Sequence, residues 1–221
     1  MRESPLITNE YYHIFNRGVD KRNIFLDQND FVRFLTSMRE FNVQKPIGSI
    51  YKKDWLEKKK VEKGTKFPIG NLVPSSPLVE IICYCLNPNH FHFVLKQLVE
   101  DGISRFMHKL SLGYTNYFNT KYKRSGSLFQ GPFKAVHIES NEHLLWVSAY
   151  VNTNAEIHNI AVEAIQYPWC SYSDYLGLRK GTLCEKSVIL GQIKNIAYKD
   201  FVEKTIPLIK EKKEAVKYLV E

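Results

Sequence analysis

The chain has 221 residues, enough for one domain with a substantial core and an appended tail. Hydrophobic residues make up 44% of it, which argues against a disordered chain. The 31 Lys and Arg against 23 Asp and Glu give a formal net charge of +8, which favours a polyanionic partner. The N-terminus has no apolar signal region and no apolar run approaches about 18 residues, so we expect a cytoplasmic protein without membrane contact.

The first third of the chain contains one strand, one helix and an irregular basic stretch. Residues 11–16 alternate like a strand, and Asp27 opens a helix whose apolar positions keep helical spacing through Phe41. Periodicity is then lost over about 43–77, a lysine-rich and turn-rich stretch. We interpret it as a basic insertion with one short helix near 53–63 and a solvated surface.

The middle of the chain predicts a hairpin followed by a helix, a strand and a second helix. Residues 79–86 form an apolar strand, 87–89 a tight turn and 90–96 the return strand. A long helix starts at 101–102, and residues 121–131 form a basic, glycine-containing loop. Residues 133–138 predict a fourth strand, and a helix capped by Ser140 or Asn141 runs to about Asn154.

The order of these elements is β-α-β-β-α-β-α. It predicts an α+β protein with a ferredoxin-like split β-α-β antiparallel sheet, helices on one side, and a helical C-terminal tail. We place a first domain at 1–165, with its basic insertion at about 43–77. The tail covers 166–221 and consists of a loop plus helices.

Two histidines on the return strand are the first candidates for chemistry. Residues two apart in a strand point to the same face, so His90 and His92 lie side by side, with Phe91 and Phe93 on the other face. Two imidazoles on an open sheet face can chelate a divalent ion, although a bare His-x-His more often marks half-exposed strand histidines. A chelate needs a third ligand.

The last core helix offers that ligand and a nucleophile. Tyr150 and Asn154 are four residues apart and share one helical face. If this face packs beside the histidine strand, Asn154 completes the ligand set and Tyr150 stands next to the ion. Taken alone, a residue such as Tyr150 is more often a core or interface aromatic, and Tyr114, Tyr117 and Tyr122 are rival nucleophiles.

Several sequence blocks occur in an order that is typical of one family. They are His90-Phe91-His92, FNRGVDKRNIF at 15–25, YTNYFNTKYKRSGSLFQGPFKA at 114–135, AYVNTNA at 149–155 and YPWCSYSDYLG at 167–177. With these blocks the chain resembles the single-tyrosine HUH transposases, most closely the REP-associated tyrosine transposases. The resemblance spans about 11–177 without the insertion, and Ala155 stands where REP-associated members usually have proline.

The resemblance implies a DNA transposase that is both a single-strand endonuclease and a strand-transferase. It implies His90, His92 and Asn154 as ligands of Mg²⁺ or Mn²⁺ and Tyr150 as the catalytic nucleophile. Attack by the phenol would release a 3′-hydroxyl and leave a 5′-phosphotyrosine, which a second 3′-hydroxyl could reverse without ATP. The expected partner is single-stranded or hairpin-forming DNA, and a monomer is favoured over a homodimer.

Basic residues in two loops are candidates for DNA phosphate contacts, although each could equally be solvated loop charge. They are Arg17, Lys21, Arg22, Lys121, Lys123 and Arg124. The tail after Gly177 either reaches back over the DNA face or caps the sheet.

Three other functions fit part of the pattern. A non-catalytic ferredoxin-like protein that binds single-stranded nucleic acid would need neither metal nor covalent product. A phosphodiesterase that activates water would leave no protein–DNA adduct. A domesticated relative would keep cleavage and lose transposition.

Overall fold

The computed structural model describes residues 5–45, 50, 76–193 and 195–218. Most of the predicted insertion, including its proposed helix near 53–63, lies outside these residues. The β-strands are β1 (Tyr11–Arg17), β2 (Val79–Asn87), β3 (His90–Gln97) and β4 (Lys134–Ile138). The α-helices are α1 (Gln28–Glu40), α3 (Gly102–Lys121), α4 (Asn141–Asn152), α5 (Asn154–Ile157), α6 (Tyr172–Tyr175), α7 (Ser187–Leu190) and α8 (Asn195–Tyr218), and short 3₁₀ turns cover Val19–Lys21 and Ala164–Gln166.

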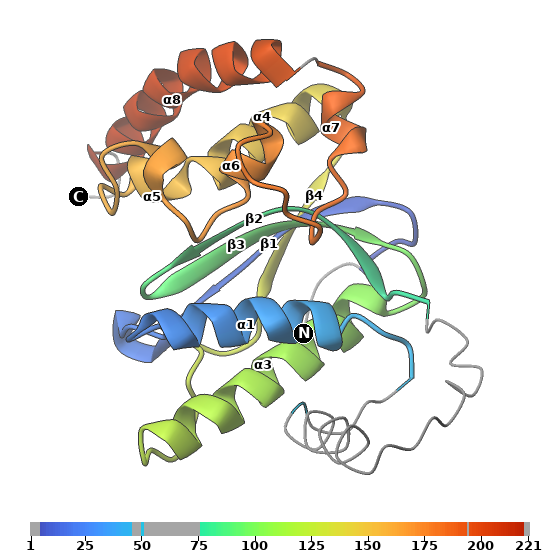
Figure 1. The fold of residues 1–221 in the computed structure, drawn as a ribbon, viewed down its shortest axis with the longest axis vertical. Helices are drawn as coiled ribbons and strands as arrows, with labels where there is room; N and C mark the ends of the chain where they lie inside the picture. Colours follow the sequence, from blue (N-terminus) through green and yellow to red (C-terminus); the bar gives the residue numbers. More distant parts are fainter. Residues whose placement is uncertain (1–4, 46–49, 51–75, 194, 219–221) are drawn as a thin grey trace, which may run out of the picture.

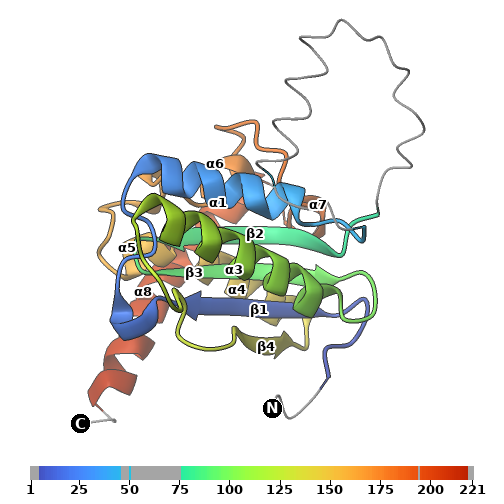
Figure 2. The same cartoon turned by 90° about the horizontal axis from the view of Figure 1, so that it is seen from below.

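The four strands form one sheet in the order β2-β3-β1-β4, and every neighbouring pair is antiparallel. Helices α1 and α3 lie together on one face of this sheet (Figures 1 and 2). The strand order and the two crossover helices are those of a ferredoxin-like split β-α-β unit, so the predicted α+β fold is confirmed.

The core between the sheet and the helices α1 and α3 is built largely from aromatic rings. Phe91 and Phe93 of β3 are fully buried, with ring centroids 4.6 Å apart, and Phe34 of α1 lies 5.5 Å from Phe91. Each such ring contributes roughly 2–3 kcal/mol of hydrophobic free energy when it is removed from water. This packing determines which face of β3 points inward, and the histidines of β3 therefore point to the other face.

That other face is covered in part, which corrects the expectation of helices on one side. In Figure 1 the helices α4, α5, α6, α7 and α8 lie across the sheet from α1 and α3. The reason is that the second face of β2 and β3 also carries apolar side chains. Ile82 and Val94 are fully buried there, in one cluster with Val147 of α4 and Val202 of α8. The sheet is thus the middle of three layers.

The chain after β4 also covers the outer edge of β2. The Leu86 amide N–H donates to the Trp169 carbonyl at 2.9 Å, and the Ser171 amide N–H donates to the Tyr84 carbonyl at 2.9 Å. Farther along, the Glu185 amide N–H donates to the carbonyl of β2 residue Ile81 at 2.8 Å. Of the two roles considered for the tail, capping the sheet is therefore the one seen. The boundary at 165/166 stays a prediction.

Helix α1 begins with a reciprocal capping arrangement that extends into a buried polar cluster. Asp27 is its N-cap and accepts a hydrogen bond from the amide of Asp30, whose own carboxylate accepts from the Asp27 amide. The Asp30 carboxylate is fully buried, and it also accepts from Lys121 Nζ at 2.7 Å and from the Tyr122 hydroxyl at 2.8 Å. This cluster joins the start of α1 to the end of α3.

None of the described helices has the length and apolar character needed to cross a membrane.

Replacing Asp30 should destabilise the fold markedly. We expect Asp30→Asn to lower the free energy of unfolding by about 3 kcal/mol, because it removes one partner of a buried charged cluster. Denaturant unfolding followed by circular dichroism measures the change. The control is Asp20→Asn, since Asp20 is exposed and pairs with Arg22 at 3.4 Å, a contact worth less than about 1 kcal/mol. Equal losses in the two variants would contradict this assignment.

Candidate active site

The site lies on the face of β3 that points away from α1 and α3. His90 and His92 both project from this face, with ring centroids 5.2 Å apart. In the sheet register, His92 stands between Cys85 of β2 and Phe15 of β1. Because β3 has a neighbouring strand on each side, the two imidazoles sit on a rigid interior part of the sheet.

Tyr150 and Asn154 come to the same place from the layer above. The Tyr150 ring stands perpendicular to the His92 ring, with centroids 5.5 Å apart. Asn154 Oδ1 lies 3.2 Å from His90 Nε2. The structure thus brings together the two imidazoles, the carboxamide and the phenol that the sequence singled out.

The helix that carries Tyr150 ends earlier than predicted. Ser140 caps α4 by accepting from the His143 amide at 3.1 Å, and α4 ends at Asn152. Thr153 leaves the helical conformation, and its hydroxyl donates to the Ala149 carbonyl at 2.7 Å. Asn154 is therefore the first residue of α5, not the last turn of α4. The small bend still keeps Asn154 beside Tyr150.

Buried hydrogen bonds hold α4 in this position. Tyr198 of α8 is fully buried, and its hydroxyl accepts from Asn152 Nδ2 at 2.8 Å and lies 3.1 Å from Ser148 Oγ. On the other side, the Ser171 hydroxyl donates to Asn152 Oδ1 at 2.6 Å. Helix α4, which carries Tyr150, is therefore held in place by the chain that follows it.

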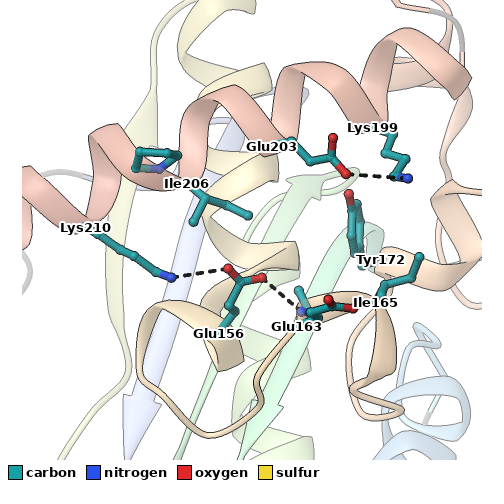
Figure 3. A pocket seen from close by; sticks show the side chains of 10 residues that line it. Glu156, Glu163, Ile165, Tyr172, Lys199, Glu203, Ile206 and Lys210 are labelled. Carbon is teal, nitrogen blue, oxygen red and sulfur yellow. Dashed lines mark hydrogen bonds and ion pairs between the residues drawn. The ribbon is translucent and has the colours of Figure 1, made fainter.

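Helix α5 is fixed by a cluster of paired charges (Figure 3). Glu156 accepts from Lys210 of α8 at 3.2 Å and from the Ala164 amide at 3.1 Å. The same residues line a cavity of about 580 Å³ between α5 and α8, where Lys199 also pairs with Glu203 at 3.5 Å. These contacts anchor α5 two residues after Asn154.

The amide group of Asn87 marks the point on which His90 and Asn154 converge. Asn87 Nδ2 donates to His90 Nε2 at 2.8 Å and to Asn154 Oδ1 at 2.5 Å. His90 Nδ1 lies 2.6 Å from Asn89 Oδ1, an acceptor, so the ring proton of a neutral His90 belongs on Nδ1 and Nε2 carries a lone pair. Two electron-pair donors are therefore aimed at one point.

This donor set fits a divalent cation. Adjacent ligands of an octahedral ion with bonds of about 2.1 Å lie roughly 3 Å apart, close to the 3.2 Å between His90 Nε2 and Asn154 Oδ1. Among the described residues, Asn154 Nδ2 is buried without a hydrogen-bond partner, so the carboxamide is not fully satisfied by the protein. Within the same residues, no three His, Cys, Asp or Glu side chains form a group that could hold a metal ion. Asn154 Oδ1 lies within reach of such an ion beside His90.

His13 belongs to the site and was not among the sequence candidates. Its Nε2 lies 2.8 Å from His92 Nδ1, and its ring is 5.7 Å from the Tyr150 ring. The two-residue alternation of β1 could have indicated it, because His13, Phe15 and Arg17 share a face. His158, which was likewise not a sequence candidate, has its ring 5.1 Å from that of His90.

Burial keeps both members of the His13–His92 pair neutral. It lowers the pKa of His13 to about 4, with a smaller contribution from His143. It also places the pKa of His92 well below its usual value, with further repulsion from His13, His90 and His158. A metal ligand must be a neutral imidazole, and these surroundings supply that state at neutral pH.

Tyr150 is half-buried, and its burial raises the pKa of the phenol. The neighbouring carboxamide of Asn154 acts in the opposite direction, although its Nδ2 makes no hydrogen bond of normal geometry within the described structure. Tyr150 is therefore protonated at neutral pH, and any nucleophilic role would require the loss of this proton.

The rival tyrosines lie across the sheet from the histidines. The Tyr114 hydroxyl donates to the Ile24 carbonyl at 2.6 Å, and the hydroxyls of Tyr117 and Tyr122 donate to Asp30 at 3.1 and 2.8 Å. All three belong to the layer of α1 and α3.

The two basic loops meet next to the β2–β3 turn. The Gly18 amide donates to the Asn89 carbonyl at 2.9 Å, and the Val19 amide donates to the Leu128 carbonyl at 3.0 Å. This places the loop with Arg17, Lys21 and Arg22 beside the loop with Lys123 and Arg124.

The cations of these loops differ in how firmly they are held. Lys121 pairs with Asp27 at 2.8 Å and with Asp30 at 2.7 Å, so its positive charge is already balanced by carboxylates of the protein. Arg124 donates to Asn119 at 3.0 Å, Arg17 to Gln130, and Arg22 is paired with exposed Asp20. Lys21 and Lys123 are exposed.

The part of the sequence that carries these residues matches a known protein family. The profile of the family described as "Transposase IS200 like" matches residues 47–154, a stretch that includes His90, His92, Tyr150 and Asn154. Residues 47–154 belong to the IS200-like transposase family. The resemblance to transposases is thereby confirmed. No curated protein matches the chain.

A solved transposase has the same fold. It is a REP-associated tyrosine transposase bound to a REP hairpin, 14% identical in sequence, and the match covers 85% of this chain and 94% of that one with a TM-score of 0.51. The likeness shows a shared fold that extends well beyond residues 47–154, since the match covers 85% of this chain.

The contacts of Tyr198 lead to a prediction about the stability of α4. We expect Tyr198→Phe to lower the free energy of unfolding by about 1–3 kcal/mol, because Asn152 and Ser148 lose a buried partner. Urea unfolding measures it. Tyr172→Phe is the matched control, since Tyr172 packs near Tyr198, with ring centroids 6.4 Å apart, and should change stability less. If the control loses as much, the hydroxyl of Tyr198 has no special role.

Proposed function

We propose that this IS200-like transposase is a metal-dependent single-strand DNA endonuclease and strand-transferase that acts through Tyr150. The observation that carries the proposal is the convergence of His90, His92, Asn154 and Tyr150 from β3, α4 and α5. Membership of residues 47–154 in a transposase family supports the same conclusion.

Three side chains would hold a divalent metal, Mg²⁺ or Mn²⁺. They are His90 through Nε2, Asn154 through Oδ1, and His92 through Nε2. The other ring nitrogen of His92, Nδ1, is hydrogen-bonded to His13. When bound, such an ion polarises a non-bridging phosphate oxygen and orients the scissile phosphate.

His13 would decide which nitrogen of His92 carries the proton. If His92 Nδ1–H donates to His13 Nε2, then His92 Nε2 is deprotonated and can bind metal. If His13 donates instead, the proton of a neutral His92 must sit on Nε2 and block it. Metal binding therefore requires the first of these two arrangements, and His13 positions His92 for it.

Tyr150 would act as the nucleophile. Its phenolic oxygen forms a bond to the phosphorus of the scissile phosphodiester, and the bond from phosphorus to the 3′-oxygen breaks. The phenol gives up its proton, and the departing 3′-oxygen gains one. The product is a 5′-phosphotyrosine, and attack by a second 3′-hydroxyl on the same phosphorus joins the strands and restores the phenol.

We propose single-stranded, hairpin-forming DNA as the substrate. The solved transposase of the same fold is bound to a REP hairpin, and the basic loops of this chain border its histidine site. Candidate phosphate contacts are Arg17, Lys21, Arg22, Lys123 and Arg124. Lys121 was predicted with them, but its ammonium group is already bound by two carboxylates. A monomer as the working unit stays part of the proposal.

A covalent adduct assay tests the nucleophile. Labelled single-stranded hairpin DNA incubated with the protein and Mn²⁺ should give a slow-migrating species on a denaturing gel, absent with a chelator. Tyr150→Phe should abolish this species because no phenol remains at the site. Tyr122→Phe is the control and should retain it. An adduct that survives Tyr150→Phe would place the nucleophile elsewhere, and free ends without any adduct would favour activated water.

The role of His13 predicts a difference between two substitutions. His13→Phe should weaken Mn²⁺ binding about 10- to 100-fold, because His92 loses the acceptor that fixes its ring proton. His13→Gln offers a carbonyl oxygen as acceptor and should lose less. Calorimetric titration of Mn²⁺ into each protein measures this without DNA, and equal loss in both variants would contradict the positioning role.

A further inference from the structure

The face of the sheet that carries the histidines is covered unevenly. Helix α4 packs over β2 and β3, whereas β4 is the edge strand at the opposite side of the sheet from β2 (Figure 2). On β4, Lys134 is exposed and Val136 is 48% exposed, while Ile138 at the far end is buried. A strip of this face beside the candidate active site therefore remains open to solvent.

The strand register connects this strip to the site. Phe15 of β1 pairs with His92 on one side and with Lys134 of β4 on the other. Neighbouring strands lie about 4.8 Å apart, so the three residues form a row in which Lys134 is about 10 Å from His92 at the backbone. Arg17, two residues after Phe15, pairs in the same way with His90.

Phe15 extends the aromatic surface of the site outward. Its ring lies within 20° of the His92 plane at a centroid distance of 5.5 Å, and within 30° of the His13 plane at 5.0 Å. Phe15 keeps partial exposure, unlike the rings of the core. An aromatic ring left partly exposed on a sheet next to a phosphate-handling site is suited to stacking on a nucleobase.

The charges on the strip favour a nucleic acid over a protein or lipid ligand. Residues on this face of β1 and β4 are Tyr11, His13, Phe15, Arg17, Lys134, Val136 and Ile138, and none is acidic. In the described structure no carboxylate pairs with Lys134 or Arg17. An aromatic ring for a base and flanking cations for phosphates match a single nucleotide unit.

We propose that Phe15, Lys134 and Val136, the β1–β4 strip, bind one unpaired nucleotide that adjoins the scissile phosphate. The base stacks on Phe15 and contacts Val136, and its outer phosphate is bound by Lys134. A paired base has no exposed ring face, so the strip selects single-stranded DNA at this position. The inference rests on the proposed function, since a scissile phosphate at His90 and His92 fixes which nucleotide reaches Phe15.

Binding measurements separate this contact from catalysis. All proteins carry Tyr150→Phe so that no adduct forms, and fluorescence anisotropy compares a blunt DNA hairpin with the same hairpin bearing a single-stranded tail on its 5′ or 3′ end. Phe15→Ala should weaken binding of one tailed hairpin about 10-fold and leave the blunt hairpin nearly unchanged. Phe15→Trp should restore tail binding because it restores a stacking surface. An abasic unit moved along the tail should remove the effect of Phe15→Ala at one position.

Lys134 has a separate test with a matched control. Lys134→Gln should reduce the salt dependence of tailed-hairpin binding by roughly 0.7 in the slope of log K against log salt, as expected for one lost phosphate contact on a single strand. Lys204→Gln removes the same charge from an exposed position on α8 and should leave the slope unchanged.

Two results would overturn the proposal. Phe15→Ala could weaken the blunt and tailed hairpins equally, or Phe15→Trp could fail to restore binding although its thermal unfolding matches the parent. Failure of the proposed function looks different. In that case the protein with Tyr150 intact forms no adduct, while the tail-specific effects of Phe15 and Lys134 persist in a protein that binds single strands without cutting them.

Discussion

The two-residue alternation of β3 is the constraint on which the site depends. Phe91 and Phe93 are buried in the core against α1 and α3, and His90 and His92 alternate with them on the other face. A slip of one residue would bring both imidazoles into an apolar core and expose two phenylalanine rings. Burying the two rings stabilises this register by several kcal/mol together. The same register places the histidines on the face that points toward α4 and α5.

The second layer turns this histidine pair into a site. Helix α4 brings Tyr150 over the imidazoles, and the bend at Thr153 places Asn154 against His90. The position of α4 depends in turn on Tyr198 and Ser171, far along the chain. The geometry around the central strand therefore depends on residues that contact neither imidazole, because their contribution is to hold α4 in place.

Much of this could be predicted from the sequence, for local reasons. The hairpin at 87–90, the cap at Asp27 and the cap at Ser140 follow from turn and capping chemistry and lie where expected. The alternation of β1 indicates only which face His13 occupies, and its importance comes from the pairing of β1 with β3, a contact between residues 79 positions apart. The covering of the second sheet face was missed for a similar reason. Ile82 and Val94 were each compatible with an open sheet until the tail was placed over them. Lys121 looked like a free loop cation, and the carboxylates that bind it lie more than 90 residues earlier.

The segment that runs along β2 links self-association to the geometry of the nucleophile. An uncovered edge strand offers unpaired N–H and C=O groups to any other extended chain, and residues 169–171 protect β2 from this kind of aggregation. Ser171 belongs to this protecting segment and also bonds Asn152 at the end of α4. Detaching the segment would thus expose an unpaired strand edge and loosen α4 in the same event, so that displacement of Tyr150 and loss of solubility are coupled outcomes of a single structural failure.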